Sequence, residues 1–365
     1  MTEPVIVGYR SFRPRIGRGA RFGEGSALIG RVTLGEGVTL GRLTTLRADG
    51  ERIDVGRGCT FLDRATVHIS DGLLPSVVGD RVTVGRYALV HACTVGDDCV
   101  LGDGAVVMDG AKVGGGAVIA AGALVPPGKQ LDGAMLYAGN PARPVRAIEA
   151  EERAAFRDAV LAGEATDELL SCALPPLDMA PFRPQGAGAG PLYALAGARP
   201  DIDRAAYVAP TALAAGDVTL AAHASIWFAT ACRAEGAEIR IGARSNVQDN
   251  SILLARDGGD IVIGKDVTVG HNVRMGACTI GDECLIGMGC EIGEGVVVED
   301  GGAIGARALV EPGTVIEAGW IWAGRPARAF RPLKPEEIAF FARGTEVYVG
   351  YTATYLADAG ALGSE

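Results

Sequence analysis

The chain has 365 residues and a formal net charge of −10, so it is long enough for two domains that each bury a core. The acidic balance excludes a basic phosphate-binding surface, and we expect no nucleic-acid partner. No run of about 18 apolar residues is present, and the N-terminal segment lacks an apolar signal core, so we expect no membrane span, no export and a cytoplasmic location.

Two stretches of the chain, about 20–150 and 205–330, follow one pattern at an offset of 185 or 186 residues. The segment "VTVGRYALVHACTVGDDCVLGDG" at 82–104 aligns with "VTVGHNVRMGACTIGDECLIGMG" at 267–289. This similarity indicates a tandem duplication.

The eight cysteines show no CxxC motif and no framework spacing. Cys93 aligns with Cys278, and Cys99 aligns with Cys284, so the cysteines recur with the repeat as small core residues do. We therefore expect reduced structural thiols and neither disulfides nor cysteine metal ligands.

A shorter period lies inside each copy, where an aliphatic residue recurs about every six positions and glycine often follows it. In the first copy these residues are Val78, Val84, Val90, Val95, Leu101, Val107, Val113, Ile119 and Val125. In the second copy they are Ile263, Val269, Met275, Ile280, Ile286, Ile292, Val298 and Ile304. This period is typical of a parallel β-helix, in which each hexad is one short strand and three hexads close one coil.

The places where this pattern stops predict the domain boundaries. The predicted segments are a first β-helix domain at 1–146, a helical segment at 147–172, a Pro/Gly linker at 173–191, a second β-helix domain at 192–332 and a C-terminal helix at 333–365. We thus predict an all-β fold of two parallel β-helix domains, each followed by an α-helix.

Histidine is scarce, and three of the four histidines occupy distinctive positions. His68 and His91 are each the second residue of a third-face hexad in successive coils, so we expect them to stack about 4.8 Å apart along the axis. Two imidazoles stacked in this way can share one zinc ion. Arg47 falls in the same column one coil earlier, whereas His223 is expected at a solvated corner.

His271 aligns with Arg86, and both are third residues of a second-face hexad at another corner of the coil. A third ligand from that corner must come from a neighbouring domain packed side by side. Gln248 falls on the same face as His271, one coil earlier. His68, His91 and His271 together would leave a fourth coordination position open, as catalytic zinc sites do.

Only a mixed pairing of the two domains supplies three imidazoles. Two first domains would set the cation of Arg86 against the metal. Two second domains would offer Leu254, Gly276 and His271, which is too few ligands.

The motifs "FLDRATVH", "YAGNPAR", "IGARSNVQDNSILL" and "WAGRPAR" resemble those of gamma-class carbonic anhydrases and their hexapeptide-repeat relatives. The resemblance covers nearly the whole chain, twice. It implies left-handed β-helices that form homotrimers, with zinc at the interfaces between subunits. One subunit supplies two histidines, matched here by His68 and His91, and its neighbour supplies the third, matched by His271.

The resemblance also implies further site residues. The family's Asn-x-Gln pair is matched by Asn246 and Gln248 in the second copy, and its Arg-x-Asp pair by Arg47 and Asp49 in the first. Gln248 would orient the hydroxide or the substrate, and Asn246 and Arg47 would complete the site. Zn²⁺ is the expected metal, with Fe²⁺ or Co²⁺ as alternatives.

The resemblance implies a zinc lyase, in which zinc-bound hydroxide attacks CO2 or another small carbonyl-type substrate where a first domain meets a second. That contact would form within one chain or between chains of a homo-oligomer. Three alternatives stay open: a zinc hydrolase or cyclase of a dedicated biosynthetic pathway, a hexapeptide-type acyltransferase, and a non-catalytic scaffold.

Overall fold

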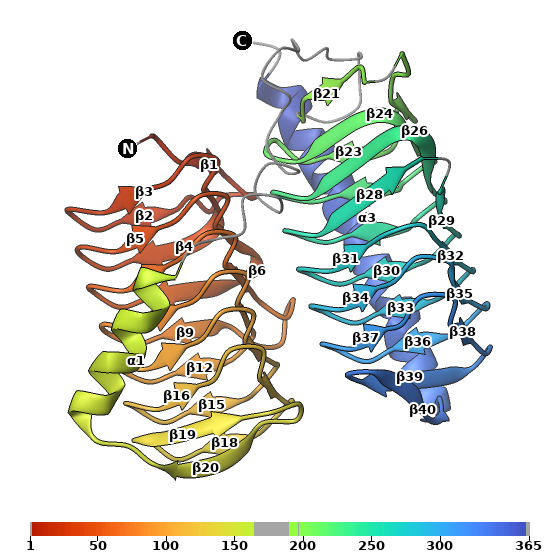
Figure 1. The fold of residues 1–365 in the computed structure, drawn as a ribbon. Helices are drawn as coiled ribbons and strands as arrows, with labels where there is room; N and C mark the ends of the chain where they lie inside the picture. Colours follow the sequence, from red (N-terminus) through yellow and green to blue (C-terminus); the bar gives the residue numbers. More distant parts are fainter. Residues whose placement is uncertain (1, 164–189, 196, 258, 363–365) are drawn as a thin grey trace. The chain divides into compact units, whose positions relative to one another are not determined.

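A computed structural model of the protein describes residues 2–163, 190–195, 197–257 and 259–362. The chain divides into two compact units, Met1–Thr166 and Asp167–Glu365. Each unit is a left-handed parallel β-helix with an α-helix at its C-terminal end, which confirms the predicted fold class (Figure 1). None of the described helices combines the length and the apolar character that a membrane crossing requires.

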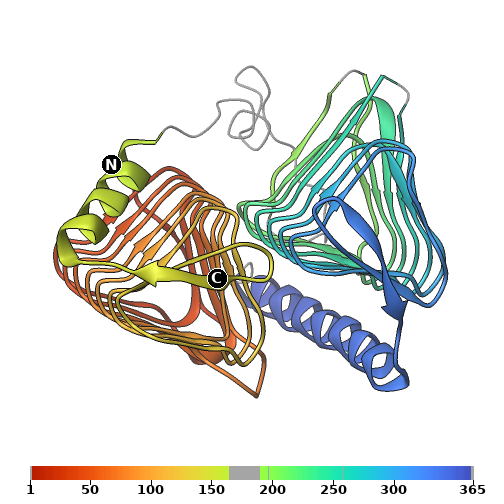
Figure 2. The same ribbon diagram turned by 60° about the horizontal axis from the view of Figure 1, so that its bottom comes forward.

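Each β-helix is a stack of three-sided coils, seen nearly end-on in Figure 2. In the first unit, face A consists of β8 (Thr66–His68), β11 (Leu89–His91), β14 (Val106–Val107) and β17 (Leu124–Val125). Face B consists of β9 (Ser76–Val78), β12 (Thr94–Val95), β15 (Lys112–Val113) and β18 (Gln130–Leu131). The helix face consists of β3 (Arg21–Phe22), β5 (Thr39–Leu40), β7 (Thr60–Phe61), β10 (Thr83–Val84), β13 (Val100–Leu101), β16 (Val118–Ile119), β19 (Met135–Ala138) and β20 (Arg143–Ala147).

The long strands β4 (Ala27–Leu34) and β6 (Thr45–Val55) continue from face A into face B, and β1 (Val5–Val7) and β2 (Arg15–Ile16) pair with β4. Gly30 allows β4 to turn this corner. Its φ is +71°, and a Cβ atom there would lie 2.2 Å from the carbonyl oxygen of Ala48. Only glycine fits both conditions.

The second unit repeats the same arrangement. Its long strands are β24 (Leu213–Leu220) and β26 (Ala231–Ile241), and β21 (Leu192–Tyr193) and β22 (Asp201–Ile202) pair with β24. Face A consists of β28 (Ile252–Arg256), β31 (Arg274–Met275), β34 (Glu291–Ile292) and β37 (Leu309–Val310). Face B consists of β29 (Ile261–Ile263), β32 (Cys278–Ile280), β35 (Val296–Val298) and β38 (Val315–Ile316). The helix face consists of β23 (Tyr207–Val208), β25 (Ser225–Ile226), β27 (Asn246–Val247), β30 (Thr268–Val269), β33 (Leu285–Ile286), β36 (Ala303–Ile304), β39 (Trp320–Gly324) and β40 (Ala327–Pro332).

The hexad aliphatic residues point inward and stack on one another. Val67, Val90 and Val107 pair in register on successive coils and are completely buried. The seven described cysteines are also buried and form no disulfide, and burial raises the pKa of each thiol. Reduced structural thiols were the expectation from the sequence; Cys172 lies outside the described residues.

The predicted helical segment at 147–172 contains α1 (Ala150–Ala162), while its part from residue 164 onward and the predicted linker up to residue 189 lie outside the described residues. Phe156 and Val160 of α1 pack on Val100 and Val118 of the helix face. Apolar contact therefore fastens this helix along the side of the first β-helix.

Arg86 holds the C-terminal end of α1. Its Nη1 donates a hydrogen bond of 2.8 Å to the carbonyl oxygen of Val160, and its Nη2 donates to that of Gly163. Because the last carbonyls of a helix have no partner within it, a guanidinium at this end satisfies them and matches the helix dipole. Arg86 also lies 3.5 Å from Asp103, measured from Nη1 to Oδ2.

The helix of the second unit, α3 (Pro335–Leu362), packs on its helix face through aromatic side chains. Trp227 is completely buried, and its ring centroid lies 5.1 Å from that of Tyr348, 5.3 Å from that of Tyr207 and 5.5 Å from that of Tyr355. Edge-to-face contacts of this kind add to the apolar area that the helix covers.

Replacing Arg86 by alanine should release the last turn of α1, because two helix carbonyls lose their donor. We expect the free energy of unfolding to fall by about 1–3 kcal/mol. Hydrogen exchange should accelerate at the amides of residues 159–163 and stay unchanged in the coils. Unchanged protection at the end of α1 would show that Arg86 does not anchor it.

Glu337 stabilises the first turn of α3, where it accepts two hydrogen bonds of 2.7 Å from Arg331 and one of 2.9 Å from the backbone N–H of Lys334. The bond with Arg331 lowers the pKa of Glu337 from 4.5 to about 2. Glu337→Gln should therefore destabilise the protein by about 0.5 kcal/mol at pH 7. Since the stabilisation exists above pH 4.5 and disappears as the pH falls toward 2, the melting temperatures of wild type and variant should converge in acid. A difference that grows on acidification would contradict this assignment.

Candidate metal centre

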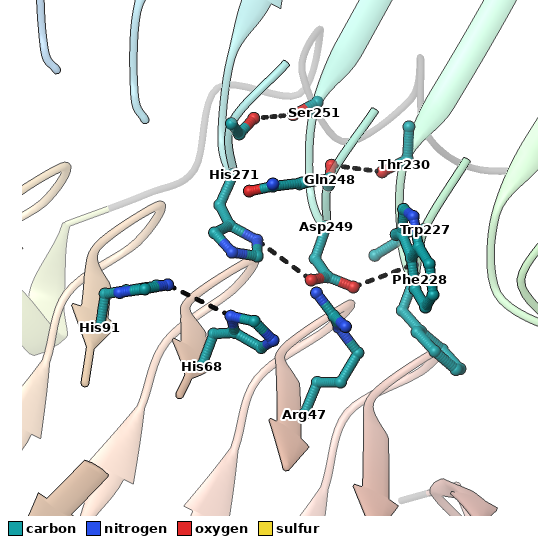
Figure 3. A network of polar contacts seen from close by, with 12 residues as sticks. Arg47, His68, His91, Trp227, Phe228, Thr230, Gln248, Asp249, Ser251 and His271 are labelled. Atoms are coloured by element: carbon teal, nitrogen blue, oxygen red, sulfur yellow. Dashed lines mark hydrogen bonds and ion pairs between the residues drawn. The ribbon is translucent and has the colours of Figure 1, made fainter. Parts of the chain in front are cut away.

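His68 and His91 end neighbouring strands of face A in the first unit. β8 and β11 pair in parallel with His91 directly opposite His68, which confirms the predicted stacking. His68 Nδ1 and His91 Nε2 are 3.2 Å apart, and both residues are buried (Figure 3). Two nitrogen ligands at about 2.0–2.1 Å from a tetrahedral zinc ion lie about 3.3 Å from each other, so the separation suits a shared metal.

A carboxylate faces the second ring nitrogen of each of these histidines. His91 Nδ1 lies 2.6 Å from Asp109 Oδ1, and His68 Nε2 lies 3.4 Å from Asp49 Oδ1. Burial raises the pKa of Asp109, but the charge and the hydrogen bond of His91 outweigh burial, so this pKa is lowered overall. Carboxylates in these positions leave His68 Nδ1 and His91 Nε2 as the nitrogens available to a metal.

Arg47 occupies the same column one coil before His68, as the hexad spacing predicts. It is completely buried, and its guanidinium donates to Asp49 Oδ2. Asp49 thus lies between Arg47 and His68. Within this unit Arg47 acts on the histidine pair through the carboxylate of Asp49.

His271 lies at the corner that follows β30 in the second unit and is also buried. Its Nδ1 is 3.0 Å from Asp249 Oδ2, and the other oxygen of Asp249 accepts a 3.0 Å hydrogen bond from the backbone N–H of Phe228 (Figure 3). With Nδ1 directed at this carboxylate, Nε2 is the nitrogen that would ligate a metal.

Gln248 and Asn246 lie beside His271 in a chain of polar contacts. Gln248 Nε2 donates to Asn246 Oδ1 at 3.2 Å, and Asn246 Nδ2 donates to Thr268 Oγ1 at 3.0 Å. Thr268 Oγ1 in turn lies 3.4 Å from the hydroxyl of Thr345 in α3. Gln248 Oε1 is buried and has no hydrogen-bond partner among the described residues, so this chain presents an acceptor for a ligand.

Sequence reasoning missed the two carboxylates Asp109 and Asp249. Asp109 follows His91 by 18 residues, the length of one coil, which is the signal that could have revealed it. Asp249 directly follows Gln248. The structure also gives a role to Arg86, since its guanidinium binds the C-terminal end of α1. His223 is exposed, as expected.

The histidines and the carboxylates that face them have the chemistry of ligands for a divalent transition metal. Each unit holds only some of the three histidines. Metal-ligating histidines usually donate the N–H of their second nitrogen to a carboxylate or carbonyl, and His68, His91 and His271 each face a carboxylate. At the positions of His68 and His91, the second unit has Leu254 and Gly276, which cannot ligate through a side chain.

Comparison with known proteins identifies relatives of this chain. The family model "Bacterial transferase hexapeptide (six repeats)" matches residues 92–127. Protein YrdA of Escherichia coli strain K12 is 37% identical over 160 residues, which are 42% of this chain and 86% of YrdA. Gamma carbonic anhydrase 3, a mitochondrial protein of Arabidopsis thaliana, is 42% identical over 148 residues, or 39% of this chain and 57% of that protein.

A candidate acetyltransferase from Desulfovibrio desulfuricans G20 aligns over 96% of this chain and 82% of its own, with a TM-score of 0.55 and 13% identity, which shows the fold alone. YrdA is matched over most of its length by less than half of this chain, as a duplication requires. The chain therefore belongs to the gamma-class carbonic anhydrase-like family of hexapeptide-repeat proteins, of which it is a tandem duplicated member.

Proposed function

We propose that the protein is a zinc-dependent lyase of the carbonic anhydrase type. In this proposal His68 and His91 of a first unit and His271 of a second unit hold one metal ion. One observation carries it: the two copies contain complementary histidines, and each histidine is already oriented by a carboxylate of its own unit. The two units would come from one chain or from two chains of an oligomer.

When bound, zinc supplies Lewis acidity that lowers the pKa of water from 15.7 to about 7. Asp49, Asp109 and Asp249 would each accept the N–H of the outer imidazole nitrogen, which leaves the lone pair of the inner nitrogen for the metal. For CO2 the net reaction adds one water across a C=O bond, forming one C–O bond and releasing one proton. The same zinc-bound water would serve a hydrolase or cyclase that acts on a larger carbonyl compound.

The residues of the second unit would orient the reacting groups. Gln248 Oε1, buried without a described partner, would accept a hydrogen bond from the attacking water or from the substrate. Asn246 fixes the amide of Gln248 through its Oδ1. In the first unit, Arg47 would act as a positioning residue, because its guanidinium neutralises Asp49 behind His68.

Acyl transfer is the second candidate. The 2.6 Å contact between His91 and Asp109 resembles a general base held by an orienting carboxylate. Metal dependence separates the two functions: turnover of an acyl thioester by the metal-free protein would favour acyl transfer.

The free thiols of the described cysteines support our inference of a cytoplasmic location.

Alanine at His68 or at His271 should remove the metal, because each substitution deletes one of three ligands. We expect wild type reconstituted with zinc to hold about one ion per chain and to hydrate CO2, and both variants to lose metal and activity together. Metal analysis of the purified full chain checks this result, with His223→Ala as the matched control. Full zinc occupancy in either variant would refute the shared site.

Asp109→Asn should weaken metal binding without removing a ligand, since the amide no longer stabilises the N–H of His91 as a charge does. We expect a 10- to 100-fold loss of zinc affinity in a chelator competition, an order of magnitude taken from comparable outer-shell residues. Asp98→Asn is the control, because Asp98 pairs with Arg81 at an exposed corner. Equal affinity in the Asp109 variant and wild type would exclude this role.

A further inference from the structure

A hydrogen-bond network within the second unit joins the amide of Gln248 to α3. It runs from Gln248 through Asn246 to Thr268, whose Oγ1 lies 3.4 Å from Oγ1 of Thr345. All four residues are buried, and the most exposed of them, Thr268, is only 7% exposed. Water therefore competes little for these hydrogen bonds, and the partners within the network decide where each proton points.

Thr345 connects this network to backbone carbonyls. Its Oγ1 lies 3.4 Å from the carbonyl oxygen of Phe341, one turn earlier in α3, and 3.5 Å from that of Asp266, which precedes β30. A carbonyl oxygen can only accept a hydrogen bond, so the single proton of the Thr345 hydroxyl is the one that is donated there. The lone pairs of Thr345 Oγ1 are then left to accept the proton of Thr268.

The carbonyl acceptor gives the whole network one direction. Thr268 donates to Thr345, and its oxygen accepts from Asn246 Nδ2. Asn246 Oδ1 in turn accepts from Gln248 Nε2. If both amides were turned over, Thr268 would donate to Asn246 and Thr345 would donate to Thr268, so no proton would remain for the carbonyl. The reversed network thus has one hydrogen bond fewer than the observed one.

The direction of the network decides which atom of Gln248 is left over. In the observed direction Nε2 is used within the network, and Oε1 is buried with no hydrogen-bond partner among the described residues. In the reversed direction Oε1 would accept from Asn246, and the NH2 group would be left over. Only the observed direction offers an acceptor for the O–H of a water molecule or a substrate.

The first copy lacks the amides and also lacks the hydroxyl. Its residues at the positions of Asn246, Gln248, Thr268 and Thr345 are Thr60, Leu62, Thr83 and Val160. Val160 of α1 packs on Val100 and Val118. A valine at this helix position is therefore compatible with a docked helix, and the hydroxyl occurs in the copy that has the amides.

We propose that Thr345 is a positioning residue, whose hydroxyl holds the amide of Gln248 so that Oε1 is presented as a hydrogen-bond acceptor for the reacting groups. The role in catalysis rests on the function proposed above, whereas the orientation of the amide does not. Thr345 acts through Thr268 and Asn246 and is not itself a catalytic residue.

Nuclear magnetic resonance of the full chain, isotope-labelled at glutamine, tests the orientation of this amide. The glutamines of the chain are Gln130, Gln185 and Gln248. Loss of one signal in the Gln248→Ala variant identifies the amide of interest. Thr345→Val should reverse the network, because the Thr268 hydroxyl then has no acceptor in it except Asn246. Hydrogen exchange of the Gln248 side-chain amide should become about tenfold faster, which corresponds to about 1.4 kcal/mol.

Three further variants separate this effect from a general loosening of α3. Thr345→Ser keeps the hydroxyl and should restore slow exchange. Thr354→Val removes another hydroxyl of the same helix, one that donates to the carbonyl of Gly350 at 3.1 Å, and should leave the Gln248 amide unchanged. Thr268→Val interrupts the network at a different residue and should accelerate exchange as Thr345→Val does. The test thus remains decisive if one of the two valine variants in the network fails to fold.

Slow exchange of the Gln248 amide in folded Thr345→Val or Thr268→Val would overturn the proposed orientation, and so would fast exchange in Thr345→Ser. Hydration of CO2 by the zinc-loaded chain gives a second readout. Thr345→Val should lower kcat/KM about tenfold at unchanged zinc content, and Thr345→Ser should not. An unchanged kcat/KM beside accelerated exchange would overturn the role in catalysis. If wild type hydrates no CO2, the function proposed above fails, while accelerated exchange in Thr345→Val still supports the orientation.

Discussion

The parallel hydrogen bonds between successive coils are the constraint on which the rest of this structure depends. The backbone N–H of Leu89, for example, donates to the carbonyl of Ala105 one coil further at 2.8 Å, and the N–H of Ala92 donates to that of His68 at 3.0 Å. This register converts a spacing along the chain into a column in space. The histidine pair exists because 23 residues separate His68 from His91 and the turn after His68 absorbs those in excess of one coil.

Such columns are what the sequence could predict, because the inward aliphatic residue marks every strand and the others follow by counting. Arg47, His68 and His91 were placed in this way. The role of Asp109 could not be predicted in this way, because Asp109 lies after its strand, at a corner, and its side chain reaches back one coil to His91. A hexad count says which face a residue belongs to and not how far its side chain reaches. The contact between Arg86 and α1 joins residues 74 and 77 positions apart, beyond any local pattern.

The two copies share one scaffold and differ in the sets of polar residues attached to it. The first unit combines a histidine pair with two supporting carboxylates, whereas the second combines one histidine with an amide chain that extends through Thr268 to α3. At the place where the first unit has its histidine pair, the second unit has Leu254 and Gly276, which line a groove. A rigid coil permits such exchange, since an outward side chain can change without disturbing the inward stack.

Arg86 links this difference between the two copies to the stability of α1. A histidine at position 86 would give the first unit a potential ligand at the corner where the second unit has His271. The same change would take from α1 the donor that now satisfies its last carbonyls. A change of Arg86 to histidine would thus meet a stability cost before any gain in chemistry. The difference between the two copies at this position is therefore tied to the stability of α1.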